Sequence, residues 1–454
     1  MIRKVCVSSF VIVLFAGGLG SFAYGQASWW KTYGDSLADN GSSVRQTNDG
    51  GYIIAGSTAS FGAGVTDVYL IKTDAAGSEV WARAFGDTME DGGNAVLEAA
   101  DSGYVIAGYT GSFGAGEHDV WLIRTNAQGD TVWTRTYGGT SGDAGNSVAP
   151  TGDGGYIITG YTWSYGAGNA DVYLVKINAA GDTAWTRTFG GTSDDEGYSV
   201  QQTVDGGYIV SGVTNSFGAG IADVYLVKTN AAGDTTWTRT YGGTSNDEGY
   251  SVQQTSDSGY IIAGYTSSFG AGNQDVYLVK TNAAGDKLWT RTIGGSLRDW
   301  GNCVRQIAGG GYMITGVTRS FGAGARDLYL VKTNAAGDTA WTRTYGGTDN
   351  DAGSAVQPTV DGGWIIVGST ASFGAGNADV YLIKTDTIGY VGVAERNRNA
   401  RATSRMHGAT FIRTLAPGTV AFDALGRRVA QAKSGIYFVR EADGQAARKV
   451  VLTK

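Results

Sequence analysis

The sequence is poor in the residues on which disulfide-stabilised, zinc-dependent and histidine-based proteins rely. Its 454 residues include only 2 Cys, 2 His, 4 Met and 3 Pro, and 17% of them are charged. Cys6 lies in an apolar N-terminal segment, so Cys303 is the one cysteine expected in the processed chain, and no intrachain disulfide can form there. His118 and His407 are far apart and give no pattern for a zinc cluster or a catalytic triad. We expect no metal site and no catalytic residues.

Long apolar runs are also scarce. The one pronounced apolar run lies at the start of the chain, where it follows Arg3 and Lys4. Residues 23–25 (Ala-Tyr-Gly) after it form a small-x-small cleavage pattern. Residues 1–25 therefore read as a secretory signal peptide. A membrane anchor is the alternative, but Gly and Ser interrupt the run. No later segment keeps helical periodicity, so we expect an all-β chain with no membrane span after the signal is removed.

Glycine, by contrast, is abundant, with 74 residues, and aliphatic and aromatic residues remain plentiful. This composition favours a turn-rich β protein over disorder. A tryptophan that opens a Trp-Thr-Arg-Thr-like stretch recurs at an interval of 52 residues after a first interval of 51: Trp30, Trp81, Trp133, Trp185, Trp237, Trp289, Trp341. A fixed period of this length indicates a solenoid, a propeller or an array.

Each repeat contains four short strand signals. In one unit we expect strands at Ser199–Thr203, Gly207–Thr214, Asp223–Thr229 and Trp237–Tyr241. The second and third are apolar on both faces, which is typical of a sheet covered on both sides. Four such strands per repeat predict the blade of a β-propeller. The loops after the second and fourth strands should share one face, and tight turns should close the other.

The two ends of the repeat array predict a closed ring. The array begins with a fourth strand (Trp30–Tyr33) and ends with a third strand (Asp379–Asp386). The first strand therefore fits as the missing outer strand of the last blade, which hides an edge that an open array would expose. Residues 26–390 are predicted to form a seven-bladed propeller closed by strand exchange.

The composition changes after the last repeat. Residues 391–410 read as a linker, and residues 411–454 as a small β-sandwich-like module with strands at Gly418–Phe422, Gly435–Arg440 and Arg448–Leu452. The tail is basic, whereas the propeller is acidic and the whole chain has a net charge of −7. An acidic propeller argues against nucleic acid as a partner.

The C-terminal module resembles a known family. Residues 420–429 (VAFDALGRRV), 434–440 (SGIYFVR) and 448–454 (RKVVLTK) are similar to the type A sorting domain of the bacterial type IX secretion system. The resemblance implies export across the outer membrane by the type IX secretion machinery through residues 411–454, to a secreted or cell-surface location. The chain departs from the family in length, because no strand signal occupies the segment between Thr410 and Gly418.

The repeats resemble secreted bacterial β-propeller repeats with a W-x-x-x-[FY]-G-G opening and a D-G-G-Y-I-I-x-G core. This resemblance covers residues 26–390 and implies the fold and an extracellular setting, but no particular reaction. The Gly-x-x-x-Trp spacing from Gly233 to Trp237 is also similar to a motif of quinoprotein propellers. Their cofactor ligands are absent, so we expect no cofactor.

Two aspartates and a set of aromatic and basic residues recur in every unit. One aspartate opens a D-x-G turn: Asp39, Asp91, Asp143, Asp195, Asp247, Asp299, Asp351. The other starts the third strand: Asp67, Asp119, Asp171, Asp223, Asp275, Asp327, Asp379. Calcium binding is one interpretation of Asp194, Asp195 and Glu196, but the alternating oxygen ligands of a calcium loop are missing. We interpret the repeated aspartates as structural turn caps. The repeated aromatics are expected to pack between blades rather than bind sugars, and the basic residue that ends the third strand should be exposed or paired with aspartate.

Function should appear where the units differ. In unit six, Arg298 and Trp300 replace small or acidic residues, with Arg319 and Arg326 nearby, and Trp163 is unusual in unit three. Arginine beside tryptophan is typical of recognition surfaces, so these five residues are candidate ligand contacts. We predict a non-catalytic binding or scaffold module for an extracellular protein or glycan. A carbohydrate-active or other hydrolytic propeller is the alternative, which would place acid pairs asymmetrically at one mouth of the ring.

Overall fold

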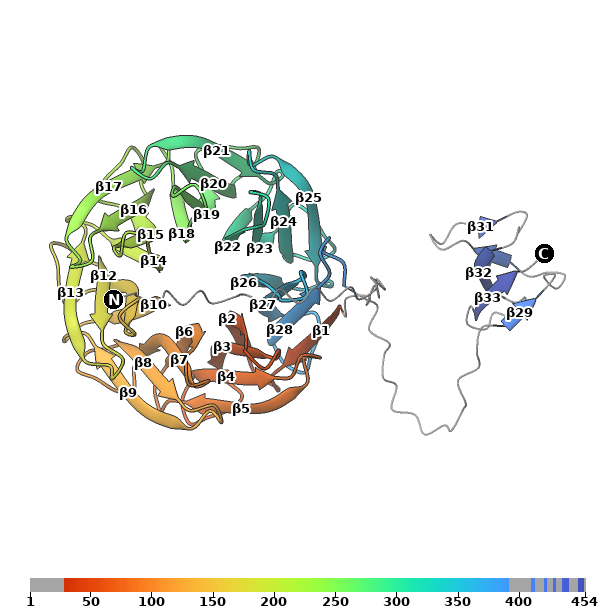
Figure 1. Ribbon diagram of the computed structural model, residues 1–454, viewed down its shortest axis with the longest axis horizontal. Helices are drawn as coiled ribbons and strands as arrows, with labels where there is room; N and C mark the ends of the chain where they lie inside the picture. The colour runs from red at the N-terminus through yellow and green to blue at the C-terminus, as the bar shows by residue number, and fades with distance from the viewer. Residues whose placement is uncertain are drawn as a thin grey trace, which may run out of the picture. The chain divides into compact units, whose positions relative to one another are not determined.

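The computed structural model describes residues 28–391 and five short strands between residues 410 and 452. Strands β1 to β28 of the first segment form seven four-stranded antiparallel sheets. These sheets stand around a common centre as the blades of a propeller (Figure 1). Among the described residues there is no helix, and hence none that could cross a membrane. The predicted all-β, seven-bladed propeller is confirmed.

Within each blade the strands follow one another outward from the centre, so the first strand is innermost (Figure 1). Blade one contains β2 (Asp39–Gln46), β3 (Tyr52–Thr58), β4 (Asp67–Thr73) and β5 (Glu79–Phe85). Blade two contains β6 (Asp91–Glu98), β7 (Tyr104–Thr110), β8 (Asp119–Thr125) and β9 (Thr131–Tyr137). Blade three contains β10 (Asp143–Pro150), β11 (Tyr156–Thr162), β12 (Asp171–Ile177) and β13 (Thr183–Phe189). Blade four contains β14 (Asp195–Gln202), β15 (Tyr208–Thr214), β16 (Asp223–Thr229) and β17 (Thr235–Tyr241). Blade five contains β18 (Asp247–Gln254), β19 (Tyr260–Thr266), β20 (Asp275–Thr281) and β21 (Lys287–Ile293). Blade six contains β22 (Asp299–Gln306), β23 (Tyr312–Thr318), β24 (Asp327–Thr333) and β25 (Thr339–Tyr345). Blade seven contains β26 (Asp351–Pro358), β27 (Trp364–Thr370), β28 (Asp379–Thr385) and β1 (Trp29–Tyr33).

The seventh blade is completed by the N-terminal strand. β1 pairs antiparallel with β28, in a register that runs from Trp29 opposite Lys384 to Tyr33 opposite Val380. β1 thus occupies the outer position that the fourth strand takes in every other blade. The ring closes by strand exchange, as the repeat register predicts, and the outer edge of β28 is covered.

The closing strand places Trp29, and not Trp30, in the position of the repeated tryptophan. Trp29 lies against Gly77 of blade one, with its ring centroid 5.8 Å from that of Tyr52, and the repeated tryptophans of the other blades contact the next blade in the same way. Trp30 instead packs within blade seven, 5.0 Å from Phe373. The assignment of Trp30 is therefore wrong by one residue, because the pairing register decides which of two adjacent tryptophans faces the neighbouring blade.

The apolar core lies between the blades rather than inside any one of them. One cluster joins Ile209, Val224 and Leu226 of blade four to Val252 and Tyr260 of blade five. Every residue of β16 is buried, and so is every residue of β15. Each blade is thus covered on its two faces by its two neighbours, which explains why the second and third strands are apolar on both faces.

The first strand of each blade is longer than the sequence pattern predicts. β14 begins at Asp195 rather than Ser199, and its register shifts between Gly197 and Ser199, opposite Gly212. Such a β-bulge inserts an extra residue and breaks the two-residue alternation by which a strand is recognised. The D-x-G motif, expected as a turn, is therefore the start of the innermost strand.

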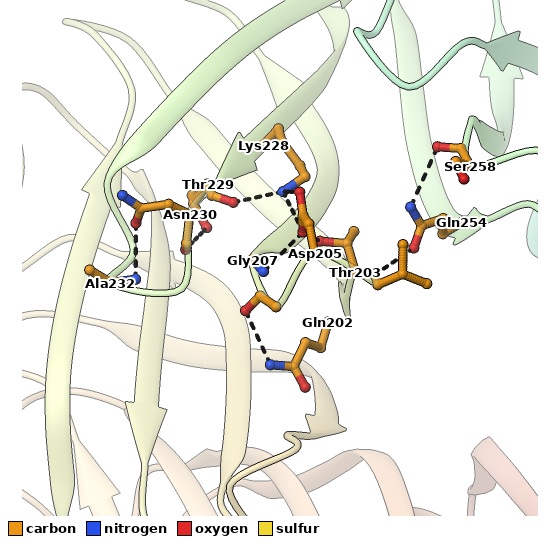
Figure 2. Close-up of polar contacts among 12 residues, drawn as sticks. Gln202, Thr203, Asp205, Gly207, Lys228, Thr229, Asn230, Ala232, Gln254 and Ser258 are labelled. Atoms are coloured by element: carbon orange, nitrogen blue, oxygen red, sulfur yellow. Dashed lines mark hydrogen bonds and ion pairs between the residues drawn. The ribbon is translucent and has the colours of Figure 1, made fainter.

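A repeated ion pair fixes the turn between the first and second strands (Figure 2). In blade four, Lys228 Nζ lies 2.9 Å from Asp205 Oδ2 and donates a hydrogen bond of 2.8 Å to the carbonyl of Thr229. Asp205 Oδ1 also accepts hydrogen bonds from Thr203 Oγ1 and from the backbone N–H of Gly207. Of the two alternatives for the basic residue that ends the third strand, pairing with aspartate is confirmed here, although the lysine is buried.

The C-terminal segment forms a sheet of its own. Its strands are β29 (Thr410–Ile412), β30 (Val420–Phe422), β31 (Arg428–Val429), β32 (Gly435–Arg440) and β33 (Arg448–Leu452), in the order β29-β33-β32-β30-β31. β29 runs parallel to β33, and the other pairs are antiparallel. β29 was not predicted, because three residues are too few to show a period. The expected sandwich arrangement, the signal peptide and most of the linker lie outside the described residues.

Candidate functional site

Two kinds of connection distinguish the faces of the propeller. Tight turns such as 203–207 and 230–234 follow the first and third strands, and they lie on what we call the closed face. Longer loops such as 215–222 and 242–246 follow the second and fourth strands, and they lie together on the open face, where Ala222 and Asn246 form a parallel bridge. This arrangement confirms the expected pairing of loops on one face.

The repeated aspartates hold the loops of the open face. The first of them is buried: Asp195 Oδ2 accepts hydrogen bonds from the backbone N–H of Gly191, at 2.8 Å, and from Ser216 Oγ, at 2.6 Å. The second is Asp223, whose Oδ2 accepts from the backbone N–H groups of Ala219 and Gly220 at 2.9 Å. These contacts satisfy loop N–H groups that would otherwise be left unpaired.

The two sets of aspartates meet at each boundary between blades. A Cβ atom added to Gly242 would lie 2.0 Å from Asp223 Oδ1 and 2.7 Å from Asp247 Oδ2, so only glycine fits between the two carboxylates. Burial raises the pKa of Asp223, backbone hydrogen bonds oppose this rise, and the charge of Asp247 adds to it. Within residues 28–391, no three His, Cys, Asp or Glu side chains are grouped so as to hold a metal ion.

An aromatic belt lies on one side of the central mouth, toward the open face. It consists of Tyr198 of blade four, Tyr250 and Tyr265 of blade five and Trp300 of blade six. Successive ring centroids are 5.3, 5.9 and 6.2 Å apart. The guanidinium of Arg326 lies 5.9 Å from the centroid of Trp300 and extends the belt by a cation–π contact. The belt is therefore a continuous row of rings over three adjacent blades.

Hydrogen bonds hold two of these rings in place. Trp300 Nε1 donates to Gln274 Oε1 at 2.8 Å, and the hydroxyl of Tyr265 donates to Glu248 Oε1 at 2.7 Å. Tyr265 is buried, whereas Trp300 is half-buried. A ring that is fixed before a ligand arrives loses little conformational entropy on binding.

The belt breaks the sevenfold symmetry of the ring. At the position of Tyr198 and Tyr250, the other blades carry only small or amide side chains: Ser42, Asn94, Asn146, Asn302, Ser354. At the position of Trp300, the other blades carry Asn40, Gly92, Ala144, Glu196, Glu248, Ala352. The rings thus gather on one side of an otherwise uniform mouth.

Two glutamates accompany the rings. Glu196 and Glu248 occupy the same position in blades four and five, and both are half-buried. Burial raises the pKa of Glu196, a hydrogen bond from Tyr198 opposes this rise, and the charges of Glu248 and Asp194 add to it. The belt therefore combines ring faces with two carboxyl groups that can accept hydrogen bonds, and burial raises the proton affinity of Glu196.

The structure brings together some of the candidate ligand contacts and separates others. Trp300 and Arg326 stack, as described above, and Arg298 is exposed, with its charge acting on Tyr265. Arg319 is also exposed, and its backbone N–H donates to the carbonyl of Arg298 at 2.9 Å. Trp163 is 49% exposed on blade three and has no ring contact with the belt among the described residues. Trp163 is thus not part of this cluster.

Sequence reasoning missed Tyr198, Tyr250 and Tyr265, which form most of the belt. A comparison of equivalent positions in the first strand would have found Tyr198 and Tyr250, because serine or asparagine stands there in the other blades. Their proximity to Trp300 depends on the stacking of neighbouring blades. Cys303 is a free, buried thiol in the inner strand β22.

Comparison with known sequences adds little. No protein-family model matches this chain. The regulatory protein FlaEY of Caulobacter vibrioides is 24% identical over 205 residues, which are 40% of this chain. The chain spans only 20% of the length of that protein.

Several solved structures are similar in fold. The Pan2 WD40 domain of Neurospora crassa matches 78% of this chain and 95% of its own, with 8% identity and a TM-score of 0.48. The extracellular domain of a hybrid two-component system from B. thetaiotaomicron matches 94% of this chain and 60% of its own, with 11% identity and a TM-score of 0.43. A protein of unknown function from Bacteroides caccae matches 62% of this chain and 90% of its own, with 13% identity and a TM-score of 0.38. Likeness at this level does not identify an activity or a ligand.

Proposed function

We propose that this chain is a secreted or cell-surface bacterial propeller that acts as a non-catalytic binding module. The observation that carries the proposal is the aromatic belt, which is confined to three adjacent blades of a ring whose other repeats are nearly identical. Because four of the seven blades form the same fold without these rings, the belt is a local feature that the fold itself does not require. Tyr, Trp and Arg are also the residues that most often dominate binding energy.

The chemistry of the belt favours an extracellular glycan as the ligand. Half-buried ring faces suit the apolar faces of sugar rings, and the carboxylates of Glu196 and Glu248 can accept hydrogen bonds from hydroxyl groups. The belt lies in a mouth rather than on a flat face, and a narrow chain enters such a mouth more readily than a second folded protein does. Binding of a protein instead is the other outcome of the test.

Delivery to the cell exterior is the second part of the proposal. The signal-like residues 1–25 and the sorting-domain resemblance of residues 411–454 support export through the type IX secretion machinery. In a bacterium that has this machinery, deletion of residues 411–454 should retain the protein inside the outer membrane. Release of the shortened chain at the normal level would contradict this part without affecting the binding proposal.

The binding proposal is tested with the purified protein on glycan and protein arrays. Trp300→Ala and Tyr250→Ala are compared with the matched control Trp163→Ala. Trp163 is an exposed tryptophan of an open-face loop but lies outside the belt. Loss of glycan binding in the two belt variants, with binding kept in Trp163→Ala, is the expected result. Equal binding by all three variants, or no binding by the parent protein, would refute a role for the belt.

The glutamate pair favours a second candidate, a carbohydrate-active hydrolase. The pKa of Glu196 is raised by burial, and the charge of Glu248 adds to this rise, so two carboxyl groups act on one another here, as a glycoside hydrolase requires. Under this alternative, an oligosaccharide panel should show turnover that Glu196→Gln and Glu248→Gln abolish. Binding without turnover would favour the non-catalytic module.

A further inference from the structure

We propose that the end of the central channel nearest the closed face is a binding site for a small oxyanion-bearing molecule, a carboxylate or a phosphate. This site is separate from the aromatic belt, which lies toward the open face on the first strands β14, β18 and β22 and on the second strand β19. A cavity of about 470 Å³ occupies the centre of the ring here and is lined by residues of six blades. That volume lies within the range of small-molecule sites.

The wall of this cavity carries positive charge without a balancing carboxylate. One position near the end of the first strand supplies most of the polar lining in five of the seven blades: Arg45, Gln201, Gln253, Arg305, Gln357. Among the described residues that line the cavity there is no Asp or Glu. The two arginines come from blades one and six, so their proximity results from closure of the ring.

Arg45 is the less satisfied of the two. Its Nε is buried without a hydrogen-bond partner, and within residues 28–391 its guanidinium has no ion pair. Burial and the neighbouring charge of Arg305 lower the pKa of Arg45 to about 10. In contrast, the buried Lys228 has an aspartate partner at 2.9 Å. Arg45 as a whole is half-buried on the cavity wall, and a partly buried cation without a counter-charge is costly, so a bound anion would reduce that cost.

Arg305 is held in position by its neighbours. Its Nη1 donates to the carbonyl of Val304 at 2.8 Å, and its Nε donates to Gln357 Oε1 at 3.2 Å. No carboxylate pairs with Arg305 among the described residues. A guanidinium presents a planar fork of N–H donors, which matches the oxygens of a carboxylate or phosphate.

The three glutamines turn the remaining wall into a set of donors. Gln201 Oε1 accepts from the backbone N–H of Gln254 at 2.8 Å, and Gln253 Oε1 accepts from that of Gln306 at 2.6 Å. Gln357 Oε1 accepts from Arg305. All three amide oxygens are therefore occupied, and within the described residues their NH₂ groups have no acceptor. A wall of two guanidinium groups and three spare amide donors selects for a ligand rich in acceptor oxygens.

The decisive variant is Arg45→Gln, because glutamine already stands at the equivalent position in blades four, five and seven and therefore fits the strand. We expect this variant to weaken anion binding by about tenfold or more, which is the usual effect of losing one charge-assisted contact. We also expect the unliganded variant to unfold at a higher temperature than the parent protein, since an unpaired, partly buried charge is removed. If Arg45 served the fold alone, its replacement would lower the unfolding temperature.

Binding is measured by calorimetry on the full chain with glucuronate, glucose 6-phosphate and glucose. Glucuronate and glucose 6-phosphate distinguish a carboxylate from a phosphate ligand, and glucose tests whether the charge is needed. Arg305→Gln should weaken binding as Arg45→Gln does, and the control Arg319→Gln, on an exposed open-face loop, should not. Trp300→Ala should leave anion binding unchanged, so failure of the belt and failure of this site can be told apart.

Two results would overturn the proposal. The first is that neither acid binds the parent protein at millimolar concentration, or that glucose binds as well as the acids when the belt is disrupted by Trp300→Ala. The second is that Arg45→Gln and Arg305→Gln bind as the parent does, or that Arg45→Gln unfolds at a lower temperature without ligand.

Discussion

Replacement of Asp205 by alanine should destabilise blade four through the buried ammonium group of Lys228 (Figure 2). The carboxylate of Asp205 receives Lys228 Nζ at 2.9 Å, together with the hydroxyl of Thr203 and the N–H of Gly207. The Lys228 side chain is only 5% exposed, whereas that of Asp205 is 60% exposed. After the substitution, the ammonium group would keep only the carbonyl of Thr229 as a described partner.

The expected cost follows from these contacts. Each lost hydrogen bond to Asp205 in the turn contributes about 1 kcal/mol, which gives about 2 kcal/mol for Thr203 and Gly207. Removing one partner of a fully buried ion pair costs about 3–5 kcal/mol. Because Asp205 is largely exposed and water can approach the ammonium group, we reduce this contribution to about 1–2 kcal/mol. The free energy of unfolding should fall by about 3–4 kcal/mol in all.

A double-mutant cycle with Lys228→Met isolates the ionic part. The free energies come from urea unfolding monitored by tryptophan fluorescence, with the parent and the three variants measured under the same conditions. In the Lys228→Met background, Asp205→Ala should cost only the turn contribution of about 2 kcal/mol, so the coupling energy should be about 1–2 kcal/mol. A coupling energy of zero would refute the reasoning.

Blade six supplies a control that the chain already contains. Gly309 stands there in place of the aspartate, and Lys332 is partly exposed, with no ion pair among the described residues. Lys332→Met should therefore change the free energy of unfolding by less than about 0.5 kcal/mol. If this variant were as costly as Lys228→Met, burial of the lysine stem rather than ion pairing would explain both results.

Two further predictions concern the same turns. Ser258 has φ +66°, where five other blades have glycine, so Ser258→Gly should raise the free energy of unfolding by about 0.5–1 kcal/mol. Thermal unfolding measures this gain, and Ser256→Gly, at a neighbouring turn position without positive φ, should show none. Burial raises the pKa of Asp205, but hydrogen bonds from Thr203, Lys228 and Gly207 outweigh it and lower the pKa to about 2. An unfolded aspartate has a pKa of about 3.9, so the stability that the ion pair contributes is fully present above that pH and is lost as the pH falls toward 2. Over this interval the melting temperature of Asp205→Ala should therefore decline less than that of the parent protein.

The sequence by itself determined the architecture, because the signals for it are local and are repeated. The interval of 52 residues, four strand signals in each unit and a fourth strand at the start of the array were sufficient to predict seven blades and their closure. Apolar residues on both faces of strands such as β16 also predicted the burial between blades.

Only the tertiary structure decided which of two adjacent tryptophans joins blades seven and one, and where each first strand begins. The choice of tryptophan depends on the pairing register of β1, and the start of a first strand such as β14 depends on a bulge at Gly197. The repeated sequence pattern shows neither feature. The aromatic belt and the two arginines of the channel depend on contacts across blades. Arg45 and Arg305 lie far apart in the sequence and line one cavity because the ring is closed. A repeat shows which residue is unusual in each unit, but the packing of the units decides which unusual residues meet.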